Sequence, residues 1–404
     1  MGLLPRLHLD IGWAEIASIF APLVSSRAEL HARAADPWPA HAVPALSVRT
    51  AFDAVLTSLA LPQGSVVAMS AITIQNMADV VRAHGLKPAP VDIGLASLAP
   101  EASAVDRVLA STGAAAYVHA HLYGARADLH DVAAVCRARG AVLIEDCAQG
   151  YTGAPPRTVS QADVSLYSFG PIKAQTCLSG AVAIFRDEAR AQNAGAILAA
   201  HPPMPEHWFR VRAMKYAALK LLSAPTLYGL AVAAMRARGL DPDKAIGGAA
   251  RGFSGADLMA ALRRAPPRSL LRLMARRTSE RGDASWRTRC GAILDDALGA
   301  AFERPGRAAP IQAYWLYPVL VEDAAAASAA MRAAGFDATR GATSLRAITE
   351  GDAGAPTPNA AALIEHVLYL PIGPAISAQT LERMANALRQ NARPWARPPE
   401  KIAA

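Results

Sequence analysis

Short apolar runs alternate with amphipathic segments through the first half of the chain. The runs are typical of buried β-strands, and the amphipathic segments follow the helical period of about 3.6 residues. The pattern predicts strands at residues 65–69, 89–92, 114–119, 141–144, 164–168 and 181–185. It predicts helices at residues 47–61, 74–84, 101–110 and 127–139. This alternation favours an α/β fold with a doubly wound, mostly parallel sheet that is covered by helices on both faces.

The pattern changes after residue 187, where the chain becomes largely helical up to about residue 300. After residue 300, the pattern predicts strands at residues 314–321 and 367–370. It predicts helices at residues 324–334 and 377–390. A chain of 404 residues is too long for one simple core. We therefore expect a large domain at residues 1–300, with a helical insert at about 187–250, and a small α+β C-terminal domain at residues 301–404.

One stretch of the insert, residues 221–235, is apolar and uncharged. It is flanked by basic residues, namely Lys215, Lys220, Arg236 and Arg238. It is shorter than the roughly 20 residues that span a bilayer. Two interpretations stay open, a buried or subunit-interface helix and an interfacial contact with a membrane surface.

The chain is basic, with a formal net charge of +8. Such a charge attracts phosphate cofactors, nucleotide-linked substrates, nucleic acid or acidic lipid. No RNA-binding signature or interleaved aromatic pattern is present, so we expect no nucleic-acid partner. The four cysteines are Cys136, Cys147, Cys177 and Cys290. No two of them have CxxC spacing, which argues against a metal site and favours reduced thiols. Charges within residues 1–19 make a poor secretory signal, so a cytoplasmic location is expected.

Two stretches carry candidate chemistry. The first, residues 142–150, is an apolar run that ends in Glu145 and Asp146. A carboxylate at the carboxyl end of a parallel strand faces the crevice where such sheets bind ligands, although a helix cap or a loop charge is the alternative. In the second, Lys173 lies between two apolar strands with no acidic residue nearby in sequence. A desolvated lysine has a lowered pKa and suits a nucleophilic amine; a solvated turn lysine is the alternative.

Together the two stretches resemble the DegT/DnrJ/StrS family of pyridoxal-phosphate (PLP) dependent aminotransferases. The matching positions are Glu145, Asp146, Ala148, Gln149, Ser168, Phe169 and Lys173. The family's Val-His-Leu-Tyr-Gly segment is similar to residues 118–124, and its Leu-x-Leu-Pro strand is similar to residues 367–371. The resemblance covers most of the chain, from about residue 47 to residue 390.

The resemblance implies a PLP-dependent transferase of fold type I and a role for each matching residue. Lys173 would bind PLP as a Schiff base, and Asp146 would pair with the ring nitrogen. Gln149 would lie beside the ring and its oxygen substituent. Ser168 and the helix start at Arg49 and Thr50 would receive the phosphate. The implied partners are an amino donor such as glutamate, an anionic keto acceptor that is by family default a nucleotide-linked keto-sugar, and a second subunit in a homodimer.

Several positions depart from the family pattern. Arg49 replaces a small residue, so it either adds a phosphate contact or crowds the phosphate site. Ile74 falls where the family often has an aromatic residue that stacks on the ring, and an aliphatic residue covers that face more weakly. Phe253 or Ser254 stands where the family has an asparagine that reaches the neighbouring subunit. The small-domain substrate segment is not recognisable in residues 340–348, so the acceptor stays open, with a lipid-linked or other anionic substrate also compatible.

The sequence bears on three other functions. Another PLP reaction, such as elimination, is disfavoured by the lysine, because family dehydratases often lack it. A non-catalytic PLP-binding or regulatory protein stays open because of the departures at Arg49, Ile74 and Phe253. A nicotinamide enzyme is disfavoured, because no G-x-G-x-x-G lies between a predicted strand and helix, and no P-loop is present.

Overall fold

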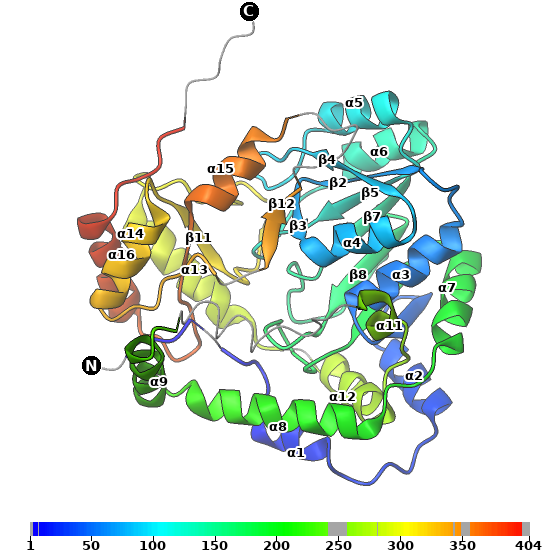
Figure 1. Cartoon of the computed structure of the whole chain (residues 1–404), viewed down its shortest axis with the longest axis horizontal. Helices are drawn as coiled ribbons and strands as arrows, with labels where there is room; N and C mark the ends of the chain where they lie inside the picture. The colour runs from blue at the N-terminus through cyan, green and yellow to red at the C-terminus, as the bar shows by residue number, and fades with distance from the viewer. Residues whose placement is uncertain are drawn as a thin grey trace, which may run out of the picture.

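A seven-stranded sheet forms the centre of the larger part of the molecule (Figure 1). The computed structural model describes residues 3–6, 8–240, 257–280, 282–341, 344–348 and 356–397. The sheet strands are β1 (Ala42–Ala45), β2 (Val66–Ser70), β4 (Lys87–Val91), β5 (Ala116–Ala120), β7 (Val142–Asp146), β8 (Val164–Ser168) and β9 (Ala181–Phe185). Their order is β1-β9-β8-β7-β5-β2-β4, and the run from β8 to β4 is parallel. β9 is antiparallel to both of its neighbours. The predicted α/β fold with a mostly parallel sheet is confirmed.

Helices cover both faces of this sheet, because successive side chains of each strand point to opposite faces. One face packs against α3 (Val48–Leu59), α4 (Gln75–Ala83) and α7 (Glu188–Ala200). The other face packs against α5 (Ala102–Thr112) and α6 (His130–Ala138) over β2, β4, β5 and β7. Beside them, α2 (Arg27–Ala35), α8 (Glu206–Leu222) and α12 (Arg268–Ser279) cover β8 and β9.

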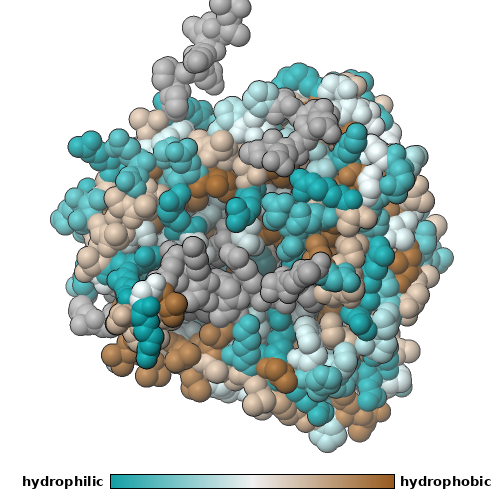
Figure 2. Space-filling view, viewed as in Figure 1, coloured by the Kyte–Doolittle hydropathy of each residue, from teal (hydrophilic) through white to brown (hydrophobic). Residues whose placement is uncertain are grey.

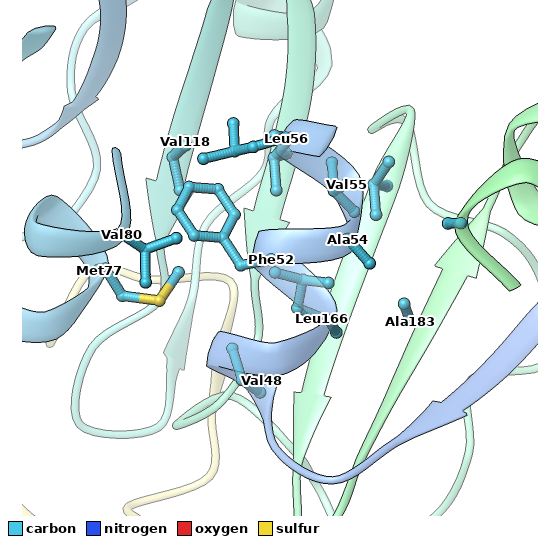
Figure 3. Packing of buried hydrophobic residues seen from close by; sticks show 14 of the residues in the cluster. Val48, Phe52, Ala54, Val55, Leu56, Met77, Val80, Val118, Leu166 and Ala183 are labelled. Carbon is cyan, nitrogen blue, oxygen red and sulfur yellow. The ribbon is translucent and has the colours of Figure 1, made fainter. Parts of the chain in front are cut away.

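Phe52 anchors α3 on its face of the sheet (Figure 3). Its ring is fully buried and lies between Met77 and Val80 of α4 and the strand residues Val118 and Leu166. Burial of an aromatic ring of this size contributes on the order of 2–3 kcal/mol. This packing fixes the start of α3 next to the carboxyl ends of the central strands.

The C-terminal part has its own apolar cluster, which runs from Trp286 to Leu388. It is built from α13 (Ser285–Leu298), β11 (Tyr317–Leu320), α14 (Ala324–Ala333), β13 (Val367–Leu370) and α16 (Ala378–Asn391). β11 and β13 pair antiparallel, and α13 packs against α16. The predicted α+β character of this part agrees with these elements, whereas the division of the chain at residue 300 stays a prediction.

Short strands join the two parts of the molecule. β3 (Ile72–Ile74) pairs with β12 (Leu345–Ala347), and β6 (Ala125–Arg126) pairs with β10 (Ile311–Gln312). The remaining described helices are α1 (Trp13–Ser18), α9 (Pro225–Ala237), α11 (Leu258–Leu262) and α15 (Pro358–His366). These strand pairs hold the C-terminal part against the edge of the sheet where the central strands end.

Candidate functional site

The two stretches singled out in the sequence lie on neighbouring strands. In the parallel pairs, Asp146 of β7 is level with Ala120 of β5 and with Leu166 of β8. β8 ends at Ser168, and Lys173 follows in the turn beyond it. Lys173 and Asp146 are close enough for the charge of each to shift the pKa of the other. The predicted pair is therefore brought together at the carboxyl end of the sheet.

The amine of Lys173 sits in an environment that disfavours its charge. Burial lowers the pKa of Lys173 to about 7; Asp146 raises it, and Arg49 and Arg287 lower it further. Nζ lies 3.9 Å from the centre of the Trp315 ring. The Trp315 indole Nε1 donates a hydrogen bond of 2.8 Å to the carbonyl of Ile172, which fixes the ring beside the amine. A large fraction of the amine is therefore unprotonated, and so nucleophilic, at neutral pH.

Asp146 is a buried carboxylate with few compensating partners. Burial raises the pKa of Asp146, while the backbone N–H of Ala148 and the charge of Lys173 lower it. The Ala148 N–H donates a 2.9 Å hydrogen bond to Oδ1. A buried carboxylate beside an amine suits a ligand that carries an N–H or a positive charge.

Glu145, the other carboxylate of the motif, is saturated with protein partners. It accepts hydrogen bonds from His121 Nε2 at 2.6 Å and from Ser165 Oγ at 2.8 Å, and Arg126 lies at 3.4 Å. Burial raises the pKa of Glu145, but these partners outweigh it and hold the pKa well below its usual range. His121 Nδ1 accepts from the N–H of Ala127, so Nε2 carries the proton. We assign this cluster a structural role in holding the end of β7.

The same cluster also contains possible metal-ligand atoms. Those of His121, Glu145 and Cys147 lie within 4.8 Å of one another. A metal ion there would have to compete with Arg126 and with the existing hydrogen bonds of Glu145. The structure therefore favours an ion pair over a metal site at this position.

Gln149 and Ser168 also lie at the strand ends. Gln149 is buried, and its Oε1 accepts a 2.9 Å hydrogen bond from the N–H of Tyr123. Ser168 Oγ is half-buried and accepts from the N–H of Gly170 at 3.4 Å. A Cβ added at Gly170 would stand 3.6 Å from Ser168 Oγ and 3.9 Å from Lys173 Cγ, so this turn lies directly between the two side chains.

The start of α3 contains the next two predicted residues. Ser47 caps the helix by accepting from the N–H of Thr50, and the Thr50 hydroxyl donates to the carbonyl of Leu262 at 3.0 Å. The Thr50 side chain is thus bonded within the protein. Arg49 Nη1 donates to Asn76 Oδ1 at 2.9 Å. Burial, with a contribution from Arg212, lowers the pKa of Arg49 to about 10.

Ile74 stands at the N-cap of α4, two residues before the asparagine that bonds Arg49. It is half-buried, and in the β3–β12 pair it lies opposite Leu345. An aliphatic side chain therefore lines this corner, next to the C-terminal part of the chain.

Two further arginines give the site an excess of positive charge that sequence reasoning missed. Arg212 of α8 is buried, and its Nε donates to the carbonyl of Leu178 at 2.6 Å. Arg287 of α13 is also buried, and its Nε has no hydrogen-bond partner among the described residues. Burial lowers the pKa of Arg212 and of Arg287. The charge of Asp10 offsets part of this effect for Arg287. Buried cations with little opposite charge nearby suit anionic ligands such as phosphate or carboxylate groups.

One predicted contact cannot be placed. Phe253 and Ser254, at the position of the family's asparagine, lie outside the described residues, as do residues 342–343 of the segment 340–348.

Residues 38–213 match the model of the DegT/DnrJ/EryC1/StrS aminotransferase family. The L-glutamine:2-deoxy-scyllo-inosose aminotransferase of Micromonospora echinospora is 32% identical over 111 residues, which are 28% of this chain and 26% of that protein. The chain therefore spans about a quarter of the length of this relative. The matched model covers the strands and turns that carry both sequence stretches.

Solved structures extend the likeness to nearly the whole chain. A sugar aminotransferase from Micromonospora echinospora has a TM-score of 0.70 at 19% identity, over 96% of this chain and 100% of that one. An aminotransferase from Streptoalloteichus hindustanus has a TM-score of 0.68 at 19% identity, over 96% and 99% of the two chains. At this identity the likeness shows the fold alone, and it confirms the expected fold type.

Proposed function

We propose that this protein is a PLP-dependent aminotransferase, because residues 38–213 match the model of the DegT/DnrJ/EryC1/StrS aminotransferase family. The single observation that supports it most is the pairing of the Lys173 amine, with its pKa lowered to about 7, with the buried carboxylate of Asp146. PLP needs an amine to form its Schiff base and a carboxylate to pair with its ring nitrogen. Lys173 and Asp146 would supply these two groups from neighbouring strand ends.

The residues at the site fit PLP by their chemistry. Asp146 would accept the proton of the ring nitrogen and keep that nitrogen positively charged. Gln149 would stand beside the ring, and Ile74 would cover it. Ser168 and the N-terminal end of α3, with Arg49, would hold the phosphate. When bound, PLP supplies an electron-withdrawing ring that stabilises negative charge on the neighbouring carbon.

The chain's own groups account for the proton transfer that an aminotransferase needs. The free Lys173 amine is uncharged in part at neutral pH, so Nζ would be able to accept and return a proton. Trp315 lies over this amine and limits its contact with water. The site therefore contains a base at the place where the substrate amine is exchanged.

The proposed substrates are an amino-acid donor, such as glutamate, and an anionic keto acceptor. Arg212 and Arg287 support an anionic substrate, since each is a buried cation whose pKa burial lowers. A nucleotide-linked keto-sugar is the acceptor that the family resemblance suggests. By the same resemblance the protein is proposed to act as a homodimer.

The test follows the cofactor spectrum of the purified protein with PLP and glutamate. The absorbance of PLP bound to an enzyme amine should convert to that of pyridoxamine phosphate. Lys173→Ala should abolish this conversion, with a loss of at least about a thousandfold. The matched control is Lys87→Ala at an exposed lysine of β4, which should behave as the wild type. A PLP spectrum that persists with every amino acid tried would instead establish the non-catalytic alternative.

A further inference from the structure

The outer surface of α8 and α9 is apolar and exposed. We call its six largest hydrophobic side chains the α8–α9 stripe: Val211, Met214, Leu221, Leu222, Leu227 and Leu230. They are between 45% and 64% exposed. Seven of the eleven exposed large hydrophobic side chains in the described residues lie between positions 211 and 240. A concentration of this kind marks a surface that meets a partner.

The stripe follows the helical period on the solvent side of both helices. In α8 it runs through residues 211, 214, 218 and 221–222, and in α9 through 227, 230 and 234, with the alanines at 218 and 234 also exposed. The inner side of α8 is already in use, because Phe209, Ala213 and Tyr216 pack in the core over β8 and β9. α8 is therefore apolar on two sides, and only the inner side is needed for the fold.

Basic residues border the stripe, and acidic residues are missing from it. Residues 207–240 contain six arginines and lysines and no aspartate or glutamate; the six are Arg210, Arg212, Lys215, Lys220, Arg236 and Arg238. Of these, Arg210, Lys215, Arg236 and Arg238 are exposed. An apolar face with basic borders is typical of helices that lie in the headgroup region of anionic membranes.

An aromatic residue stands next to the stripe. Trp13 of α1 is 49% exposed, and Lys220 Nζ lies 5.9 Å from the centre of its ring. α1 packs on α8, and Figure 1 places α1, α8 and α9 along the same lower side of the molecule. In the same view, Figure 2 shows hydrophobic surface at the lower left, over α9 and the adjoining end of α8. Tryptophan and lysine side by side are the pair that favours a membrane–water interface.

The geometry fits a surface contact and not a crossing. No single helix among the described residues is long and apolar enough to span a bilayer; α8 and α9 meet the requirement only together, and they are bent by 98° at their junction. Their 17 and 13 residues correspond to about 25 Å and 20 Å, less than the roughly 30 Å of a bilayer core. α8 also cannot leave the core that its inner side fills.

We propose that the outer surface of α8 and α9, with Trp13, docks on the surface of an anionic lipid bilayer. A second copy of the chain fits this surface less well. In a two-fold dimer built on this face, the basic borders of two identical surfaces would meet without a single acidic residue from residues 207–240. Anionic headgroups supply the opposite charge, and the acyl region takes the leucines.

The test is sedimentation of the full-length, PLP-loaded protein with vesicles of phosphatidylcholine alone and of phosphatidylcholine mixed with phosphatidylglycerol. The protein should bind the mixed vesicles, and the binding should weaken as salt is added. The double variant Leu227→Glu/Leu230→Glu should lower the partition coefficient by roughly tenfold or more. The matched control is Ile311→Glu, which is as exposed as Leu227 but lies on β10, and it should bind as the wild type.

Each remaining outcome decides against the proposal. Equal binding of the wild type and of Leu227→Glu/Leu230→Glu would show that the stripe is not the contact. Absence of binding to both kinds of vesicle would also overturn it. If the wild type is then dimeric in solution and the double variant monomeric, the surface is a contact between two copies of the chain. The cofactor spectrum reports separately on the active site, so a failure here leaves the proposed function standing.

Discussion

Folded proteins usually keep charged side chains outside and large apolar side chains inside. Two regions of this molecule depart from that rule in opposite ways: the strand ends that hold Asp146 and Lys173, and the outer surface of α8 and α9. At the strand ends, charged groups lie inside the molecule, where burial raises the pKa of Asp146 and lowers that of Lys173. On α8 and α9, large aliphatic side chains lie outside. Folding alone accounts for neither, because both arrangements cost free energy in the isolated chain. We therefore interpret both as binding surfaces, one for a small charged ring and one for lipid.

The two regions differ in whether neighbouring protein groups offset the free-energy cost of their unusual side chains. The strand ends are surrounded by fixed partners, such as the indole of Trp315 and the N–H of Ala148, which hold each charged group in place. The α8–α9 stripe has no such partners: its side chains are exposed among the described residues, and basic residues border it. A change at the strand ends should therefore alter chemistry or stability, whereas a change on the stripe should alter only binding to a surface.

Among variants that keep Lys173, the largest effect on turnover is expected for Asp146→Asn. The amide keeps the size of the carboxylate but cannot hold a charge on the ring nitrogen, so PLP should still bind while turnover with glutamate falls by about a hundredfold or more. Single-turnover spectroscopy measures this loss. Asp106→Asn, at an exposed aspartate that pairs with Arg139, is the control and should leave turnover unchanged. Wild-type turnover in Asp146→Asn would remove its proposed role.

Glu145→Gln should lower stability while leaving the two candidate catalytic groups in place. It takes the negative charge away from Arg126 and from the acceptor of the His121 hydrogen bond, and breaking a buried ion pair costs on the order of 3 kcal/mol. Urea denaturation at neutral pH measures the change in the free energy of unfolding. A midpoint equal to that of the wild type would show that the cluster does not hold the end of β7.

The lowered pKa of Glu145 also predicts how the free energy of unfolding depends on pH. The folded state holds the pKa of Glu145 below its usual value, so this contribution is complete above about pH 4.3 and is lost as the pH falls through that value toward the lower folded pKa. Glu145→Gln should therefore lose less stability than the wild type between neutral and acidic pH. Urea midpoints at two pH values check the difference, and parallel losses in both proteins would contradict it.

Capture of PLP by the cofactor-free protein should depend on pH near neutrality. The pKa of Lys173 is lowered to about 7, so the uncharged amine dominates above that pH and declines below it. The rate of capture should fall by about tenfold for each pH unit below 7. Stopped-flow absorbance measures it. A fall that begins near the ordinary lysine pKa would show that the amine is solvated.

The smallest effect on stability and on cofactor conversion is expected for a substitution in the α8–α9 stripe. Leu230→Glu places a charge where the side chain is already 64% exposed, so the free energy of unfolding should change by less than about 0.5 kcal/mol. Conversion of the cofactor with glutamate should also stay at the wild-type rate. A large loss of stability would mean that the stripe is part of the core.

Local pattern was sufficient to predict most of the large sheet. Residues 164–168 and 181–185 are short, mostly apolar runs, and the structure has β8 and β9 at these bounds. β3 and β12 were missed because each has only three residues and depends on a partner far away in sequence. The described part of the insert is helical as predicted, but Leu221, Leu222, Leu227 and Leu230 are exposed, so the interpretation as a buried helix is wrong for them. The alternative of a subunit-interface helix stays a prediction.

The site could be predicted where its residues carry a local motif or match the family pattern at a predicted helix start. Asp146, Gln149, Ser168 and Lys173 lie within one short span and carry a recognisable motif. Trp315 and Arg287 approach the same amine from the C-terminal half, and no local signal distinguishes them from an ordinary core tryptophan and a surface arginine. Long-range packing places them, and such packing leaves no pattern in a single sequence.

Lys173 is proposed to be the lysine that binds the cofactor. The direct measurement is borohydride reduction of the PLP-loaded protein, followed by digestion and mass spectrometry of the peptide that carries the phosphopyridoxyl group. The group is expected on Lys173, with none on the exposed Lys87 or Lys215. A label on another lysine, or a protein that takes up no label at all, would contradict the account.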